Sequence, residues 1–384
     1  MTRSTTHAAS IDLSHSLSRR LVLGGSAALA AGAAAGSAFT SQRRAFAQDA
    51  TPIASPAPGG VPVDPQMQEV LDALAAFEAP ALNNVTPQVG RNLPSFASAL
   101  QAVLAERGEP AQEPVGGISH ALFPALDGTE LVARIYRPLD AGDELLPVLV
   151  YFHGGGFVIA NLDTYDASCR ALANATGCLV ASVASRQAPE NPFPTAADDA
   201  SAATQHFISA AGTIGGDPER VAVAGESAGG NLATGVAIRS RDEGAPIPVH
   251  QLLVYPVATF APEGESLESI EQFATAAPLS AAALEWFGMY YLPDMSAASD
   301  PLASPLLAAD LSGLPPATVI LAQIDPLQSQ GMVYAEALEA AGVPVTSTLY
   351  EGVTHEFFGM GAVVDQAATA VEEAAAALRS SFGM

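Results

Sequence analysis

From residue 117 onward, the hydrophobic pattern alternates between two kinds of segment. Short, continuous apolar runs predict strands, and longer runs with apolar residues at helical spacing predict helices. Strands are expected at 117–123, 130–137, 147–152, 178–184, 220–225, 250–255, 316–322 and 345–350. Helices are expected at 164–175, 194–211, 228–240, 329–341 and 363–380. This order predicts an α/β-class protein with a doubly wound, mostly parallel sheet of about eight strands and helices on both faces.

Two parts of the chain depart from this alternation. Residues 64–107 show helical spacing in "PQMQEVLDALAAFEAP" and in "SFASALQAVLAER", and residues 258–312 contain no strand pattern but carry the aromatic-rich piece "SAAALEWFGMYYL". We expect these two segments to form a helical cap over the sheet. The first two strands are joined by "ALDGTE", whose Asp-Gly pair is typical of an antiparallel hairpin turn.

The first 63 residues have a different composition. Arg19 and Arg20 precede a weakly apolar Ala/Gly-rich run, and a small-x-small site ends at Ala47. This pattern predicts that residues 1–47 are a Tat-type export signal, so that the protein is secreted, periplasmic or on the cell surface. An uncleaved membrane anchor is the alternative. Residues 48–63 are rich in Pro and Gly and predict a linker, which leaves 64–384 as the folded domain.

Charge and cysteine content narrow the classes of partner. The formal net charge is −25, and all 15 basic residues are arginine. Such a surface repels nucleic acid and anionic membranes, so neither is expected as a partner. Cys169 and Cys178 lack the spacing of a metal site, and we expect two free, buried thiols, although export would permit a disulfide.

The segment "VAVAGESAGGN" contains the first candidate for chemistry. An apolar strand runs into Gly225-Glu226-Ser227-Ala228-Gly229, and a helical pattern follows. G-x-S-x-G between a strand and a helix predicts a nucleophile elbow, in which Gly225 and Gly229 permit the tight turn and Ser227 is exposed. An ordinary strand–glycine–helix turn is the alternative reading of this short motif.

A serine nucleophile needs a base and a carboxylate. His355 follows the last predicted strand, and Asp325 follows the strand before it, in "TVILAQIDPLQSQG". Asp310 and Glu351 are rival carboxylates, but neither directly follows a strand on the correct side. The remaining histidines are expected to lie in the signal or to be structural: His7, His15, His120, His153, His206 and His250.

The segment "YFHGGGF" places three glycines after the third strand. Backbone N–H groups stabilise an oxyanion best where no Cβ blocks the approach of the substrate. We therefore expect Gly155 and Gly156, with the N–H of Ala228, to form an oxyanion hole. His153 and Gly154 are expected to support this loop, with His153 orienting it through hydrogen bonds.

With these motifs together, the chain resembles the hormone-sensitive-lipase-like (bacterial family IV) carboxylesterases of the α/β-hydrolase fold. The family's HGGG is present at 153–156, its GDSAGG appears as "GESAGG", its DPL motif as "DPLQSQG", and its HGF as "HEF". The resemblance covers nearly all of 64–380. It implies Ser227, Asp325 and His355 as the catalytic residues and the cap described above. It also suggests a homodimer, because the family often pairs through an edge strand.

Some positions depart from the family pattern. Glu226 replaces Asp and Glu356 replaces Gly, and both add negative charge near His355, so we expect His355 to hold its proton more firmly. Arg186 and Glu190 are expected to form a structural ion pair. Candidate walls of the substrate pocket, or else packed residues of the cap, are Phe157, Trp286, Phe287 and Tyr290.

The predicted function is hydrolysis of short- to medium-chain carboxylic esters through an acyl-enzyme, with a small-molecule ester as partner. No metal or other cofactor is expected, because "HEFF" lacks the second histidine of a zinc helix. The alternatives are a deacetylase or amidase with the same triad, a non-catalytic small-ligand receptor on the same fold, and a membrane-anchored scaffold.

Overall fold

A computed structural model of the chain describes residues 58–264 and 268–384. The predicted signal at 1–47 and residues 48–57 of the predicted linker lie outside the described residues. The last residues of that linker belong to the folded part. Val61 and Val63 are half-buried and pack against Phe273 and Ile324, and the Asp64 N–H donates to the carbonyl of Gly352.

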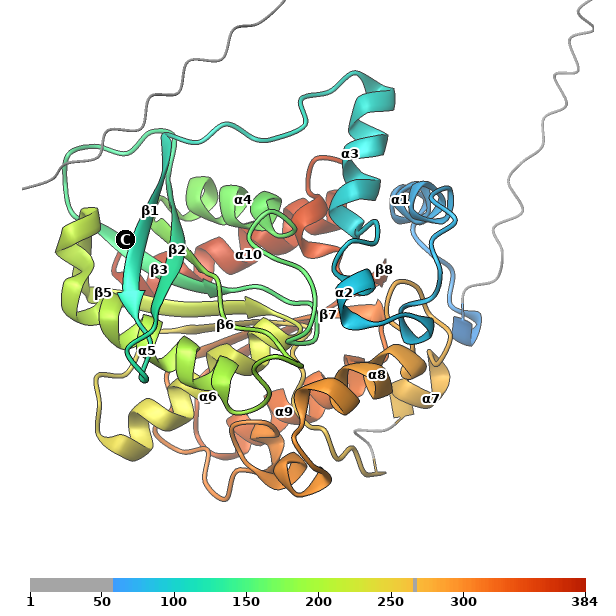
Figure 1. Ribbon diagram of the computed structural model, residues 1–384. Coiled ribbons are helices and arrows are strands. Elements are labelled where there is room, and N and C mark those ends of the chain that lie inside the picture. The colour runs from blue at the N-terminus through green and yellow to red at the C-terminus, as the bar shows by residue number, and fades with distance from the viewer. Residues whose placement is uncertain (1–57, 265–267) are drawn as a thin grey trace, which may run out of the picture. The chain divides into compact units, whose positions relative to one another are not determined.

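The centre of the structure is a mixed, mostly parallel sheet of eight strands in the order β1-β2-β4-β3-β5-β6-β7-β8 (Figure 1). The strands are β1 (Gly117–Pro124), β2 (Glu130–Arg137), β3 (Leu146–Phe152), β4 (Leu179–Val183), β5 (Gly216–Glu226), β6 (Gln251–Val254), β7 (Ala317–Ile324) and β8 (Val345–Thr354). β1 and β2 form the predicted antiparallel hairpin, and β2 is also antiparallel to β4. The other neighbours are parallel, which confirms the predicted fold class.

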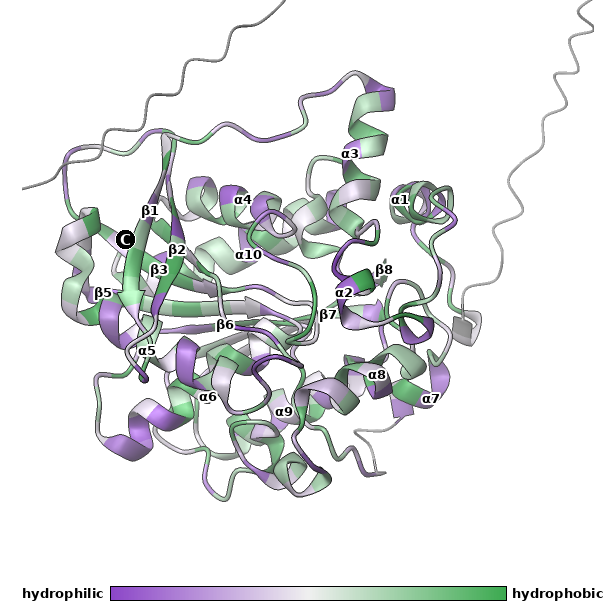
Figure 2. Ribbon diagram, viewed as in Figure 1, coloured by the Kyte–Doolittle hydropathy of each residue, from purple (hydrophilic) through white to green (hydrophobic). Residues whose placement is uncertain are grey.

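Helices cover both faces of the sheet (Figure 1). α5 (Thr195–Ala210), α6 (Ala228–Glu243) and α9 (Gln328–Ala340) pack on one face, and α4 (Asp166–Thr176) and α10 (Asp365–Phe382) pack on the other. Successive residues of β3 alternate between the two cores: Val148 and Val150 face the first, and Leu149 and Tyr151 face the second. Because both faces are covered, a strand such as β3 reads as a continuous apolar run (Figure 2).

The segments predicted to form a cap lie near the carboxyl ends of the parallel strands (Figure 1). The first segment contains α1 (Pro65–Ala75), α2 (Pro87–Gly90) and α3 (Phe96–Arg107), and the second contains α7 (Glu268–Gln272) and α8 (Ala281–Tyr291). Trp286 of α8 joins the two segments, since its indole N–H donates to the carbonyl of Val85 at 3.0 Å. Residues 201 positions apart in sequence therefore meet above the sheet.

The predicted pairing of Arg186 with Glu190 is wrong. Arg186 instead pairs with Asp199, a fully buried residue of α5, and with Asp127 in the β1–β2 turn. Glu190 pairs with Arg91, which follows α2 in the cap. The buried carboxylate of Asp199 needs a cationic partner, and the fold brings Arg186 to it.

Both cysteines are buried and free. Cys169 lies on α4, and Cys178 directly precedes β4. In the described part of the chain, no helix is both long and apolar enough to span a bilayer.

Candidate active site

Four strands end where the predicted site residues begin. β3 ends at Phe152, just before the HGGG loop, and β5 ends at Glu226, just before Ser227. β7 and β8 end one residue before Asp325 and His355, respectively. These four strands are parallel, so their carboxyl ends meet at one edge of the sheet, where α/β proteins bind their ligands.

Ser227 lies at the turn between β5 and α6. Its backbone has φ 57° and ψ −118°, a conformation that costs energy for a residue with a side chain. A Cβ on Gly225 would lie 2.1 Å from the carbonyl group of Gly229, and a Cβ on Gly229 would lie 1.9 Å from the carbonyl oxygen of Phe152. Only glycine fits at both flanks, so the turn raises the Ser227 side chain into the cavity described below.

The imidazole of His355 contacts the carboxylate of Asp325. The Nδ1 atom lies 2.7 Å from Oδ2, and because a carboxylate can only accept, Nδ1 is the donor. The other oxygen of Asp325 accepts the N–H of Leu327 at 2.8 Å. Both side chains are almost fully buried. This pair leaves Nε2 of His355 facing the cavity as the nitrogen able to take a proton.

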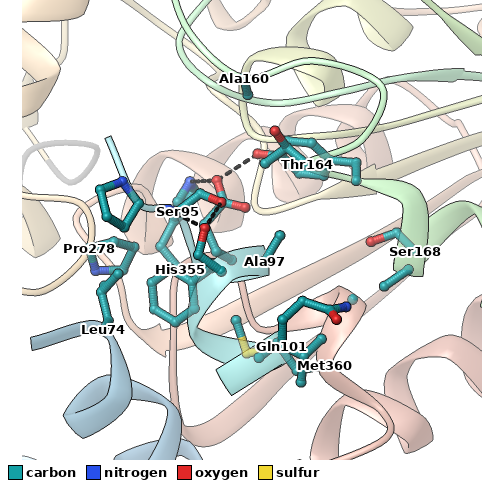
Figure 3. Close-up of a pocket in the computed structure, with 18 of the residues that line it drawn as sticks. Leu74, Ser95, Ala97, Gln101, Ala160, Thr164, Ser168, Pro278, His355 and Met360 are labelled. Carbon is teal, nitrogen blue, oxygen red and sulfur yellow. Dashed lines mark hydrogen bonds and ion pairs between the residues drawn. The ribbon is translucent and has the colours of Figure 1, made fainter. Parts of the chain in front are cut away.

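Ser227 and His355 line the same cavity, which has a volume of about 1640 Å³. Among the described residues, no hydrogen bond joins the Ser227 hydroxyl to His355. Such contacts often tighten only when substrate binds. Figure 3 labels Leu74 of α1, Gln101 of α3 and Ser168 of α4 around His355, so the predicted cap and a helix that packs on the sheet both contribute walls.

The HGGG loop places bare backbone beside this cavity. Gly155 and Gly156 have φ of 98° and 58°, in the region that favours glycine. A Cβ on Gly156 would lie 2.1 Å from the ring of Phe287. The N–H groups of Gly155 and Gly156 donate to no acceptor among the described residues, and Ala228, as the first residue of α6, has no acceptor within its helix. All three N–H groups are therefore free to bind an anionic oxygen.

His153 and Gly154 support the loop. Nδ1 of His153 donates to the carbonyl of Gly154 at 2.7 Å, and its ring stacks on that of Tyr165. A Cβ on Gly154 would lie 2.2 Å from the hydroxyl of Tyr165. Burial lowers the pKa of His153. The lowered pKa favours the neutral imidazole, which can hold the loop through this hydrogen bond.

Two glutamates lie beside the Asp325–His355 pair. Glu226 is buried and accepts the hydroxyl groups of Tyr151 and Tyr255, and the Tyr255 ring packs against the imidazole of His355. Glu356 accepts the hydroxyl of Tyr165 at 2.6 Å, and its Oε1 lies 3.9 Å from Nε2 of His355.

Burial and these neighbouring carboxylates shift the pKa values of His355 and of the two glutamates. Burial lowers the pKa of His355, but the carboxylates of Asp325, Glu356 and Glu226 raise it by more, so it lies above its ordinary value. Burial and the nearby Glu356 raise the pKa of Glu226 to about 7, against the hydrogen bonds of Ser168 and the tyrosines. Burial raises the pKa of Glu356, while His355 and Tyr165 oppose the change.

Of the four aromatic residues predicted as pocket walls, Phe287 lines the cavity. The other three pack elsewhere. Phe157 is buried and stacks on Tyr291 with ring centroids 3.7 Å apart, and Trp286 and Tyr290 pack edge to face in α8. Aromatic content alone did not distinguish a residue facing the cavity from one facing the core.

The other candidate residues lie outside the cavity lining. Asp310 and Glu351, the rival carboxylates, are exposed. His250 is buried against Thr318 and Ser381, as expected for a structural histidine. Two further histidines are also outside the lining: His120 on β1 and His206 on α5.

Comparison with known proteins identifies the family. A sequence model of the alpha/beta hydrolase fold matches residues 149–359, more than half of the chain. The chain belongs to this family. Esterase LipI of Mycobacterium tuberculosis (strain ATCC 25618 / H37Rv) is 37% identical over 311 residues, which cover 79% of this chain and 96% of that protein. The ethyl acetate hydrolase of Pseudomonas putida is 38% identical over 253 residues, 65% of this chain and 78% of that protein.

Solved structures agree with this assignment. An ester hydrolase from the metagenome of Lake Arreo, in complex with a bipyridine phosphonate derivative, superposes with a TM-score of 0.75 at 38% identity, covering 84% of this chain and 100% of that one. An esterase from Pyrobaculum calidifontis superposes with a TM-score of 0.73 at 36% identity, covering 83% and 99%. The predicted membership of the hormone-sensitive-lipase-like carboxylesterases is confirmed, and with it the prediction that the chain is a carboxylic ester hydrolase.

Sequence reasoning missed several residues around the site. Tyr151, Tyr165 and Tyr255 surround the two glutamates, and Arg91 connects the cap to the core. They come from separate elements, and no spacing in the sequence relates them. In the described part of the chain, no group of histidine, cysteine and acidic residues is arranged to hold a metal ion.

Proposed function

We propose that the chain is a serine carboxylesterase that hydrolyses short- to medium-chain carboxylic esters, with Ser227 as nucleophile, His355 as base and Asp325 as its carboxylate partner. The observation that carries this proposal is the 2.7 Å contact between His355 and Asp325 in the cavity that Ser227 also lines. The elbow geometry of Ser227 and the unbonded N–H groups of Gly155 and Gly156 support it.

In the proposed mechanism, Ser227 Oγ attacks the ester carbonyl while Nε2 of His355 takes its proton. The negative oxygen is stabilised by the N–H groups of Gly155, Gly156 and Ala228, each worth about 3–4 kcal/mol in a typical oxyanion hole. His355 then gives the proton to the leaving alcohol and activates a water molecule, which releases the acid. Asp325 holds the imidazole in the correct tautomer and stabilises its charged form.

The test is hydrolysis of p-nitrophenyl esters from acetate to palmitate by residues 48–384, beside the Ser227→Ala variant. We expect rates that are highest for short acyl chains and that vanish in the variant. Unchanged activity in Ser227→Ala would contradict the proposal. Turnover of acetylated sugars or amides, but of no simple ester, would favour the deacetylase or amidase alternative.

We further propose that residues 1–47 direct export of the folded enzyme, on the basis of Arg19, Arg20 and the site ending at Ala47. We expect the exported protein to begin near residue 48, which N-terminal sequencing would measure. Substitution of both arginines by lysine should retain the protein inside the cell. An intact N-terminus on a membrane-bound product would instead support the anchor alternative.

A further inference from the structure

Glu356 is a carboxylate inside the active-site cavity, next to the nitrogen that exchanges protons. Its Oε1 atom lies 3.9 Å from Nε2 of His355, and its side chain lines the same cavity as Ser227. The hydroxyl of Tyr165 donates to Oε1 at 2.6 Å and fixes the position of the carboxylate. Asp325 already occupies the other ring nitrogen, so the proposed mechanism leaves Glu356 without a role.

The backbone of Glu356 is in an unfavourable conformation. Its φ is 72°, in the left-handed region that residues with a side chain rarely adopt. Such strain persists where the surroundings hold the residue in place, and it is concentrated at functional sites. At this position, where glycine would be unstrained, the surroundings instead hold a residue with a carboxylate beside His355.

The position of Glu356 places it beside the alcohol half of the ester substrate. In ester hydrolysis by a serine–histidine pair, Nε2 gives its proton to the oxygen of the leaving alcohol. That oxygen must come within hydrogen-bond distance of Nε2, and Glu356 is on the same side of the ring. The alcohol half of the ester, not the acyl half, therefore lies next to the Glu356 carboxylate.

The rest of the cavity offers little positive charge to oppose this carboxylate. Among the described residues that line it, Arg91 is the one arginine, and there is no lysine in the chain. The guanidinium of Arg91 is bound by Glu190 and by the carbonyls of Val158 and Ala188. The lining contains several further acidic side chains, Glu226 and Asp163 among them. A cation placed beside Glu356 would meet attraction, and an anion would meet repulsion.

We propose that Glu356 is a specificity-determining residue that favours esters of amino alcohols, in which a positively charged nitrogen lies two carbons from the ester oxygen. The inference rests on the proposed function. Water cleaves the acyl–oxygen bond to give the carboxylic acid and the amino alcohol, and the charged nitrogen does not react. Its attraction to Glu356 acts across about 4–6 Å in a partly shielded cavity, where one charge pair changes binding by roughly tenfold or more.

The test compares two esters of almost equal shape, acetylcholine and its uncharged analogue 3,3-dimethylbutyl acetate, at about pH 8, well above the ordinary pKa range of a carboxylate. We expect the kcat/KM of the wild-type enzyme to be about tenfold higher for acetylcholine. In Glu356→Gln, which can still accept the Tyr165 hydroxyl, the two values should become nearly equal. Glu351→Gln is the matched control, because this exposed residue lies outside the cavity lining, and it should keep the wild-type ratio.

Glu356→Gly provides a second variant that suits the backbone, since glycine readily adopts a φ of 72°. It should also lose the preference for the charged ester. Equal kcat/KM for both esters in the wild-type enzyme, or a preference that persists in both variants, would overturn the inference. These results differ from a failure of the proposed function, in which p-nitrophenyl acetate and both esters would show no turnover that depends on Ser227.

Discussion

The two walls of the active-site cavity are built in different ways. On the sheet side, each proposed catalytic group directly follows a strand, and Ser227, Asp325 and His355 are almost completely buried. On the cap side, the lining comes from helices that meet through a few long-range contacts, such as that of Trp286 with Val85. The proposed catalytic groups are therefore positioned by backbone geometry, whereas the substrate side of the cavity is positioned by individual side chains.

The contacts that support the sheet side of the cavity are also tighter than those that support the cap side. A Cβ at Gly225 or Gly229 would overlap backbone atoms, so the turn that carries Ser227 admits no larger residue at either position. The ion pair of Arg91 and Glu190 is partly exposed, and such pairs are weak in water. Substitutions on the sheet wall should therefore affect catalysis much more than substitutions on the cap wall.

The largest effect is expected from Asp325→Asn on the sheet wall. The amide would no longer hold the imidazole in the tautomer that leaves Nε2 free, so kcat should fall by about 10⁴-fold. Steady-state hydrolysis of p-nitrophenyl acetate measures this change. Asp310→Asn, at an exposed rival position, is the control and should retain activity. A small effect of Asp325→Asn would remove Asp325 from the proposed triad.

Gly156→Ala should have the next largest effect. The added methyl group would overlap the ring of Phe287 and would sit at a φ of 58°, so the proposed oxyanion donors would move. We expect kcat to fall by about 10²–10³-fold, the usual cost of losing one such donor. Gly212→Ala, where a Cβ meets nothing within 4 Å, should leave the rate unchanged. Equal rates for the two variants would argue against Gly156 as a donor.

Arg91→Ala tests the cap wall. Without this side chain the cap loses its bonds to Glu190, Val158 and Ala188, so substrate should bind more weakly while the chemistry is preserved. We expect KM to rise by about tenfold with little change in kcat. The control is Arg107→Ala, whose partner Glu69 lies in the same cap segment. A fall in kcat as large as that of Gly156→Ala would show that the two walls are not independent.

The smallest effect is expected in the pH profile of Glu356→Gln. Glu356 raises the pKa of His355, and His355 must be neutral to act as a base. Removing this charge lowers the pKa, so the acidic limb of kcat/KM for p-nitrophenyl acetate should move to lower pH. The limb should stay in place in Glu351→Gln. An unchanged limb in Glu356→Gln would show that the charge of Glu356 does not control the protonation of His355.

The secondary structure was largely predictable, and the differences have local causes. β5 begins at Gly216, before the predicted start at residue 220. The prediction missed these first residues because "GDPE" contains residue types that are rare in strands. β8 continues to Thr354 through Gly352, whose φ of 73° hides the extension from a pattern of apolar residues. The proposed catalytic residues could be found because each follows a strand, which the sequence pattern marks.

The partners of the charged residues were not predictable. Arg186 has Glu190 four residues away, yet it pairs with Asp199 and Asp127, because Asp199 is buried and must be neutralised. The tyrosines around Glu226 and Glu356 come from β3, the loop before α4 and the loop after β6. Such contacts depend on the packing of elements that are distant in sequence.

The sequence by itself determined the strand–helix order, the strand ends that carry Ser227, Asp325 and His355, and the glycines of the two tight loops. These features are local, since a strand, a turn or an elbow depends on a few neighbouring residues. Only the tertiary structure decided that Phe287 faces the cavity while Phe157 faces the core, that Arg91 holds the cap, and that Glu356 lies beside Nε2 of His355. Their positions follow from how separate elements pack, because burial and charge pairing act through space and not along the chain.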